Sequence, residues 1–278
     1  MAQSAEEYCA QEVRRLDPDR WLTTLFAPDA RRPALLALYA FNSEIARARE
    51  AVTQPMIGQI RLQWWREAWE GVKEGKPRQQ PVVQALYAHC RNLDIADAMT
   101  LIDARERDMD AAPMANLAEL LGYAEASSAP LMRLAAQALG AELDNNLCEA
   151  IRLAGTIYSL VGLLRAVPFL AAQQRIYLPA DRLRAAGTEP EALYQKELGA
   201  AVFTAAAEVA DAAEGLLSQL WDRRIDKTAM PALLPAALAR VHLRCLAKAG
   251  FDPRKPEASA SATRQHMALL TAAWRRRL

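Results

Sequence analysis

The run from Leu153 to Ala172 constrains the fold more than any other part of the chain, because Arg165 is its one charged residue. A helix of this length and hydrophobicity can in principle cross a membrane. The arginine lies inside the run, however, and Pro168 follows it, and both are unfavourable in a helix that faces lipid. We therefore expect a buried helix that lines a pocket, and no transmembrane helix.

The composition of the whole chain also favours helices. Its 278 residues are 52% hydrophobic and 24% charged, so the chain can bury a large core and is not of the disordered type. Only 11 residues are glycine, and residues that keep their rotamer freedom in helices outnumber β-branched ones. The prediction is an all-α fold with one helical domain at residues 1–251, followed by a loop and a basic C-terminal helix at residues 252–278.

Apolar residues recur at helical spacing in the N-terminal third. Ser4 and Glu7 form a capping box for a first helix that ends before Pro18. Further helices are expected at about residues 31–51 and 59–73. In the latter, Trp65 and Trp69 are i and i+4 neighbours, which favours a place in the core. Proline, glycine and polar segments divide the remaining chain into helices of ordinary length.

Charge and metal-binding residue types exclude several function classes. Lys and Arg number 34 against 33 Asp and Glu, so no global attraction draws the chain to nucleic acid, and we expect no nucleic-acid partner. The four cysteines form no CxxC pair, which argues against zinc and redox motifs. The histidines are scattered, and we interpret each as a surface or boundary residue: His89, His242 and His266.

The two ends of the chain suggest where it acts. Residues 1–13 contain three glutamates and no apolar core, which predicts neither a secretory signal nor an Arg-rich transit peptide. We expect a cytoplasmic protein, with a place at the inner face of the membrane. The segment from Trp274 to Leu278 is rich in arginine. It is either a solvated helix end or a peripheral contact with anionic lipid or an acidic partner.

Common catalytic motifs are absent: the sequence has no phosphate-binding glycine loop, nucleophile elbow or HExxH. The densest carboxylate cluster comprises Asp103, Glu106, Asp108 and Asp110. On a continuous helix Asp103, Glu106 and Asp110 would share one face, where their carboxylates could bind a hard cation. The alternative, which we favour, is an exposed face neutralised by Arg105 and Arg107.

Three segments together resemble the squalene/phytoene synthase family. They are Ala34–Asn42 (ALLALYAFN), Gln63–Glu67 (QWWRE) and Arg175–Asp181 (RIYLPAD). The resemblance extends from about Asp19 to Leu220. It implies a single isoprenoid-synthase-type helical bundle with a central apolar cavity. In that family two acidic motifs at the cavity mouth hold Mg²⁺ and the diphosphates of two prenyl chains, which condense head to head.

This sequence departs from the family at both acidic motifs. In the first motif, residues 42–50, the family's Cys, Arg and three Asp correspond here to Asn42, Ser43, Ala46, Arg47 and Glu50. In the second motif, residues 155–170, the family's Gln, Asn, Arg and three acids correspond here to Ser159, Gly162, Arg165, Ala166, Phe169 and Leu170. Of the family's six acidic positions, only the one at Glu50 still carries an acidic residue. Arg175 opens the RIYLP segment that follows.

These replacements predict a pocket that has lost its metal site. An arginine at a ligand position repels a divalent ion about 6 Å away by roughly 5–6 kcal/mol at an effective dielectric of ~20. We therefore expect no catalytic residue, no metal ligand and no cofactor, and Mg²⁺ only if the chain is an enzyme after all. Arg47 and Arg165 either make the remnant pocket basic enough for an anionic head group or pair with acids such as Glu44, Glu50 or Asp181.

Two further segments are similar to a non-catalytic branch of the family that assists the assembly of respiratory complex I. They are Phe41–Ala46 (FNSEIA) and Pro55–Leu62 (PMIGQIRL). Glu67, which follows the tryptophan pair, is a further point of similarity. The resemblance implies a complex I subunit or its assembly machinery as the partner. Two alternatives stay open: a divergent head-to-head prenyltransferase, and a protein that binds an isoprenoid or an anionic lipid.

Overall fold

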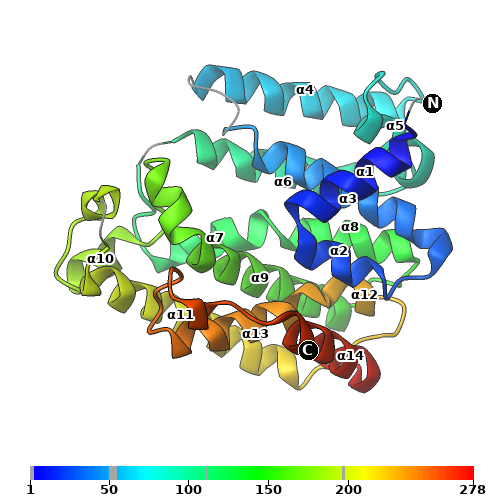
Figure 1. The fold of residues 1–278 in the computed structure, drawn as a ribbon. Helices are drawn as coiled ribbons and strands as arrows, with labels where there is room; N and C mark the ends of the chain where they lie inside the picture. Colours follow the sequence, from blue (N-terminus) through cyan, green and yellow to red (C-terminus); the bar gives the residue numbers. More distant parts are fainter. Residues whose placement is uncertain (1–2, 50–54, 111, 196–197) are drawn as a thin grey trace.

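The structure is a computed structural model that describes residues 3–49, 55–110, 112–195 and 198–278. Within those ranges the chain forms α-helices and short 3-10 helices, and no strand occurs there (Figure 1). The all-α prediction is confirmed.

The helices follow one another along the whole chain. Those of the first half are α1 (Ala5–Leu16), α2 (Pro18–Thr24), α3 (Arg32–Ala46), α4 (Pro55–Lys73), α5 (Pro81–Cys90) and α6 (Ile95–Glu106). Those of the second half are α7 (Leu117–Ala126), α8 (Ala129–Leu139), α9 (Asn145–Ala172), α10 (Ala180–Ala185), α11 (Ala200–Trp221), α12 (Met230–Leu233), α13 (Pro235–Lys248) and α14 (Ala262–Arg275). The 3-10 helices are η1 (Asp29–Arg31), η2 (Arg107–Met109), η3 (Pro190–Tyr194) and η4 (Pro256–Ala258).

Local signals explain how the N-terminal helices begin and end. The capping box of Ser4 and Glu7 is present at the start of α1. Asp17 ends α1 and also caps α2, with Pro18 in the first turn of α2. From the sequence this pair predicts only a helix stop, so α2 was not expected. The following helix is shorter than predicted, since α3 ends at Ala46.

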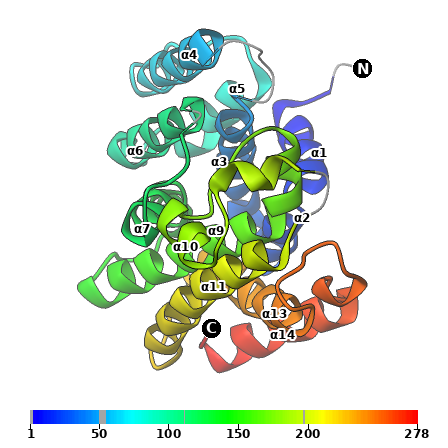
Figure 2. The same ribbon diagram turned by 90° about the vertical axis from the view of Figure 1, so that its left-hand side faces the viewer.

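Helix α9 is the centre of the bundle. It packs against α7, α8, α11 and α13 (Figure 1, Figure 2). In the described part of the chain α9 alone is long and apolar enough to cross a membrane, but 56% of that apolar window is buried inside the protein. Core helices of globular proteins meet the same criteria. The helix is buried, as the position of Arg165 and Pro168 predicts.

A glycine lets α9 approach α8 closely. A Cβ atom built on Gly155 would lie 2.5 Å from the Cα of Ala129, at the start of α8. Backbone cannot give way as a flexible side chain can, so only glycine fits at this crossing.

Aromatic side chains join α3 and α4. Trp65 and Trp69 are 3% and 0% exposed, and both meet Phe41 edge-on, with ring centroids 5.3 and 5.5 Å apart. The core interpretation of these tryptophans is confirmed.

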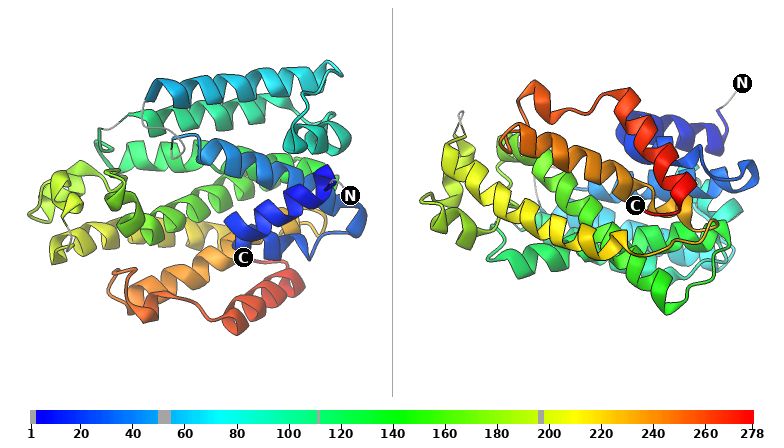
Figure 3. Two further views of the ribbon diagram at one scale, coloured as in Figure 1. Left: turned by 45° about the horizontal axis from the view of Figure 1, so that its top comes forward. Right: turned by 90° about the horizontal axis from the view of Figure 1, so that it is seen from below.

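Helices α13 and α14 lie on the side of the molecule opposite α4 (Figure 1). Seen from below, α11, α13 and α14 lie side by side (right panel of Figure 3). Helix α14 packs on α13 and buries Leu269 and Ala272. The amide of Ile225 donates to the carbonyl of Arg276 (3.0 Å), which fixes the chain after α14. A domain boundary at residue 252 stays a prediction.

Candidate functional site

The first motif lies at the C-terminal end of α3. Asn42 and Ser43 are buried, Ala46 is half-buried, and Arg47, the residue after the helix, is exposed. The hydroxyl of Ser43 donates to a backbone carbonyl one turn earlier (3.0 Å). Glu50 lies outside the described residues. The described residues at the family's acidic positions, Ala46 and Arg47, therefore offer no carboxylate.

The residues of the second motif lie along α9 and face different neighbouring elements. Gly162, Arg165 and Ala166 line a cavity of about 530 Å³ against α13 and the segment before α14. The hydroxyl of Ser159 lies 3.2 Å from that of the serine after α7. Leu170 is buried and lines another, much smaller pocket. Neither pocket is lined by a described residue of the first motif, so the structure does not bring these side chains to one shared mouth.

An ion pair between a buried aspartate and a partly exposed arginine lies at one side of the 530 Å³ cavity. Arg165 donates to Oδ2 of Asp19 (2.9 Å), and Nε2 of His242 lies 3.1 Å from the same oxygen. Burial raises the pKa of the Asp19 carboxyl, but His242 and then Arg165 outweigh burial, so the pKa lies below its ordinary value. The ionised carboxylate joins α2, α9 and α13.

This cluster corrects two interpretations of the sequence. His242 is 2% exposed, so it is not a surface or boundary residue. Arg165 does pair with an acid, but the acid is Asp19 of α2, which the sequence did not suggest. Glu50 lies outside the described residues.

The two ring nitrogens of His242 have different surroundings. One ring nitrogen faces Asp19, and the other, Nδ1, is buried without a hydrogen-bond partner among the described residues. The contact of the imidazole with Asp19 holds α13 against α2.

A second buried polar cluster surrounds Asp108 in η2. The hydroxyls of Tyr123 and Tyr177 donate to its Oδ1, over 2.6 and 2.5 Å. Arg105 and Arg175 lie 3.6 and 3.5 Å from the same carboxylate, and Arg175 also donates to the Tyr177 hydroxyl. Burial raises the pKa of both tyrosines, so the phenols stay protonated and donate. Two hydroxyls and two guanidinium groups of the protein thus surround the carboxylate.

The other carboxylates of the predicted acidic cluster pair with arginines outside the Asp108 cluster. Asp103 and Glu106 both pair with Arg66 of α4 (2.6 and 2.7 Å), and Asp110 lies 3.5 Å from Arg107. The favoured interpretation of one face neutralised by its own arginines is therefore wrong in part. The helix ends at Glu106, which takes Asp110 off the expected face, and Asp108 turns into the interior.

The apolar pocket beside the Asp108 cluster is almost filled. It is lined by Leu120, Leu163, Leu164, Val167, Leu170, Arg175, Tyr177, Leu178, Leu193 and Val209. Its volume is about 10 Å³, which is the space of a single water molecule. A prenyl chain does not fit into this space while the side chains stay as they are.

The magnesium and diphosphate that the family resemblance implies do not fit the residues present. Mg²⁺ needs carboxylate oxygens, and Ala166, Phe169 and Leu170 supply none at the second motif. In the described ranges no three His, Cys, Asp or Glu residues are grouped to hold a metal ion.

Sequence reasoning missed Asp19 and Asp108, the two acids that organise these clusters. Asp19 follows the Asp-Pro pair that starts α2, and this local signal predicts a helix start but no distant partner. Asp108 was part of a recognised cluster, and its burial becomes visible only when Tyr123 and Tyr177 are placed beside it.

Comparisons with known proteins extend the resemblance to nearly the whole chain. The model of the squalene/phytoene synthase family matches residues 13–264. The Bos taurus protein named NADH dehydrogenase (ubiquinone) complex I, assembly factor 6 is 29% identical over 280 residues, which cover 99% of this chain and 84% of that protein. The Homo sapiens protein of the same name is 26% identical over 279 residues, with the same coverage.

Solved structures agree on the fold. A dehydrosqualene synthase in complex with ligand superposes with a TM-score of 0.82 at 18% identity, over 96% of this chain and 94% of that one. A squalene synthase from Alicyclobacillus acidocaldarius superposes with a TM-score of 0.75 at 21% identity, over 90% and 95%. The isoprenoid-synthase type of bundle is thereby confirmed. The chain belongs to the squalene/phytoene synthase family.

Proposed function

We propose that this chain is a non-catalytic member of its family that assists the assembly of respiratory complex I. The observation that carries the proposal is a combination: relatives named as complex I assembly factors align with 99% of the chain, while the described motif positions lack acids. The retained bundle then serves as a scaffold for a complex I subunit or its assembly machinery.

The local chemistry supports the absence of synthase activity. A leaving diphosphate carries several negative charges, which metal ions must neutralise. At the second motif Ala166, Phe169 and Leu170 bind no metal, and Arg165 is neutralised by Asp19. The pocket of about 10 Å³ also leaves no room for a substrate chain.

Helix α14 supports a place at a membrane surface. Met267, Leu270 and Trp274 are 58%, 55% and 83% exposed, and their spacing puts them on one face, away from the buried Leu269. Arginines lie in both end turns of the helix and after it. An exposed apolar stripe flanked by basic residues suits an anionic lipid surface, with tryptophan at the headgroup level.

The assembly role is tested by deleting the gene in cells that produce the protein. We expect less fully assembled complex I on native gels stained for NADH dehydrogenase activity, and recovery when the wild-type chain is restored. The amounts of other respiratory complexes in the same extract serve as the control. Unchanged complex I in the deletion strain would refute the role.

Co-purification identifies the partner. An affinity-tagged chain extracted with mild detergent is expected to retain a complex I subunit or another assembly protein. Recovery of the tagged chain alone, from cells in the course of complex I assembly, would count against a direct scaffold.

A further inference from the structure

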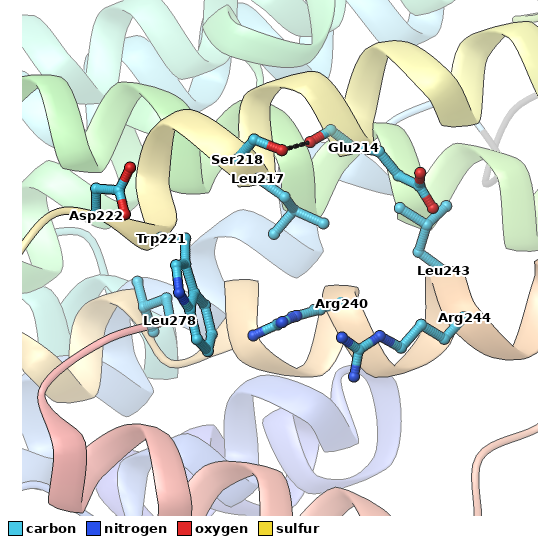
Figure 4. Close-up of a pocket in the computed structure, with 9 residues that line it drawn as sticks. All are labelled: Glu214, Leu217, Ser218, Trp221, Asp222, Arg240, Leu243, Arg244 and Leu278. Carbon is cyan, nitrogen blue, oxygen red and sulfur yellow. Dashed lines mark hydrogen bonds between the residues drawn. The ribbon is translucent and has the colours of Figure 1, made fainter.

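A pocket of about 400 Å³ lies between α11 and α13 (Figure 4), and no residue of the two family motifs lines it. Its lining comprises Glu214, Leu217, Ser218, Trp221, Asp222, Arg240, Leu243, Arg244 and Leu278. The side chain of Leu278 is buried here, so the chain that follows α14 closes one end of the pocket.

Two arginines of α13 form the basic side of this pocket. Arg240 and Arg244 are one helical turn apart and therefore share a face. The guanidinium of Arg240 lies over the ring of Trp221, 3.9 Å from the centroid. Figure 4 shows Arg240 between Trp221 and Arg244. The aromatic ring thus fixes one arginine while the other stands beside it.

Among the described residues no acid forms an ion pair with either arginine. Glu214 and Asp222 also line the pocket, but neither is ion-paired with Arg240 or Arg244 in the described structure. The pKa of Arg240 is lowered, first by burial and second by the positive charge of Arg244. Two neighbouring guanidinium groups that are not ion-paired with the carboxylates of the lining can attract an anion, and their planar donors match phosphate oxygens.

The rest of the lining is mixed: Glu214, Ser218 and Asp222 are polar, and four residues are apolar. Leu217, Leu243 and Leu278 face the same space, together with the ring of Trp221. A pocket with donors on one side and leucines on the other suits a ligand with a charged head and an apolar tail.

We infer that this pocket binds the phosphate group of an anionic amphiphile, with Arg240 and Arg244 holding the phosphate oxygens and the leucines contacting the apolar part. The exposed stripe of α14 would bring such molecules close, because the segment after α14 ends in the pocket. The inference does not depend on the role in complex I assembly, since its test uses the purified chain alone.

Isothermal titration calorimetry with soluble probes tests the inference. We expect dihexanoyl phosphatidic acid, below its micelle concentration, to bind saturably. Inorganic phosphate is expected to compete more weakly, and zwitterionic dihexanoyl phosphatidylcholine is expected not to bind. Short-chain probes avoid the membrane, so the result does not depend on α14.

Variants of α13 show whether the arginines hold the phosphate. R244M is expected to weaken binding of phosphatidic acid about tenfold or more, and R240M/R244M to abolish it. R244K keeps the charge but loses the planar fork, so its affinity should lie between wild type and R244M. K248M changes a charge on the same helix outside the pocket and should bind like wild type. Thermal unfolding followed by circular dichroism confirms that each variant is folded.

Two results would overturn the inference. Absence of saturable binding of phosphatidic acid to the wild-type chain would remove the site. Equal affinity of wild type and R240M/R244M would show that the arginines do not form it. If inorganic phosphate bound as tightly as phosphatidic acid, the amphiphile would be excluded as the ligand in favour of free phosphate.

Discussion

Arg165 of α9 and Asp19 of α2 form an ion pair of 2.9 Å, although 146 positions separate them in the sequence. Among the polar and charged positions of the second motif, Arg165 alone keeps the residue type expected for the family. In this chain its charge is paired with a buried carboxylate, while the arginine side chain itself stays partly exposed. An arginine at a position associated with diphosphate binding here stabilises the contact between two helices.

Removal of the Asp19 charge should destabilise the protein. In D19N, Arg165 and His242 lose their anionic partner, and we expect the free energy of unfolding in urea to fall by about 2 kcal/mol. This is less than for a fully buried pair, because Arg165 is partly exposed. D29N is the matched control, since Asp29 is 89% exposed in its pair with Arg32, and it should change stability by no more than about 0.5 kcal/mol. Equal effects of the two substitutions would contradict the assignment.

The same carboxylate predicts a dependence of stability on pH. The pKa of Asp19 is lower in the folded protein than its ordinary value of 3.8. Its stabilising contribution is therefore complete above that value and is lost as the pH falls below it, through the folded-state pKa. Urea unfolding of wild type and D19N from pH 6 down to about pH 3 should show a smaller loss of stability for D19N at the acid end. Parallel curves would show that Asp19 does not titrate in this way.

Local and periodic signals in the sequence predicted the helical class and part of the core. The capping box of Ser4 and Glu7, the burial of Trp65 and Trp69, and the buried run of α9 depend on neighbours within one or two turns. The loss of acids from the two motifs could also be recognised from the sequence, because the residue type at each motif position is known without a structure.

The polar clusters of the site could not be predicted in this way. Asp19 gains its partners from α9 and α13, and His242 is 223 positions away from it in the chain. Asp108 is buried only because Tyr123 and Tyr177 reach it from other elements. Such contacts depend on tertiary packing, and a single sequence carries no record of which distant residues meet.

A pair of glycine substitutions in α9 tests the close crossing with α8. G155A should lower the free energy of unfolding by about 1–3 kcal/mol, because the new methyl group would overlap the backbone of Ala129. G162A places the same methyl group in open space in the same helix, so it should be neutral or stabilising by up to about 1 kcal/mol. Urea unfolding monitored by circular dichroism distinguishes the two. A stable G155A variant would mean that the two helices are not in backbone contact.

Binding of the chain to lipid vesicles tests the surface of α14. We expect wild type to co-sediment with vesicles rich in phosphatidylglycerol and to remain in solution with pure phosphatidylcholine. W274S should reduce the bound fraction several-fold, because the stripe loses its largest apolar side chain. M56S serves as the control: Met56 is 67% exposed but lies on α4, at the other end of the molecule (Figure 1). An equal reduction by both substitutions would show that α14 is not the contact.

The most direct test of a synthase fold without synthase chemistry is a diphosphate-release assay. The purified chain at high concentration is incubated with farnesyl or geranylgeranyl diphosphate and Mg²⁺, with an active squalene synthase as the positive control. We expect no diphosphate above the level of a blank without protein. Release of diphosphate that depends on both the chain and Mg²⁺ would contradict the proposal and show that the chain is an active prenyltransferase.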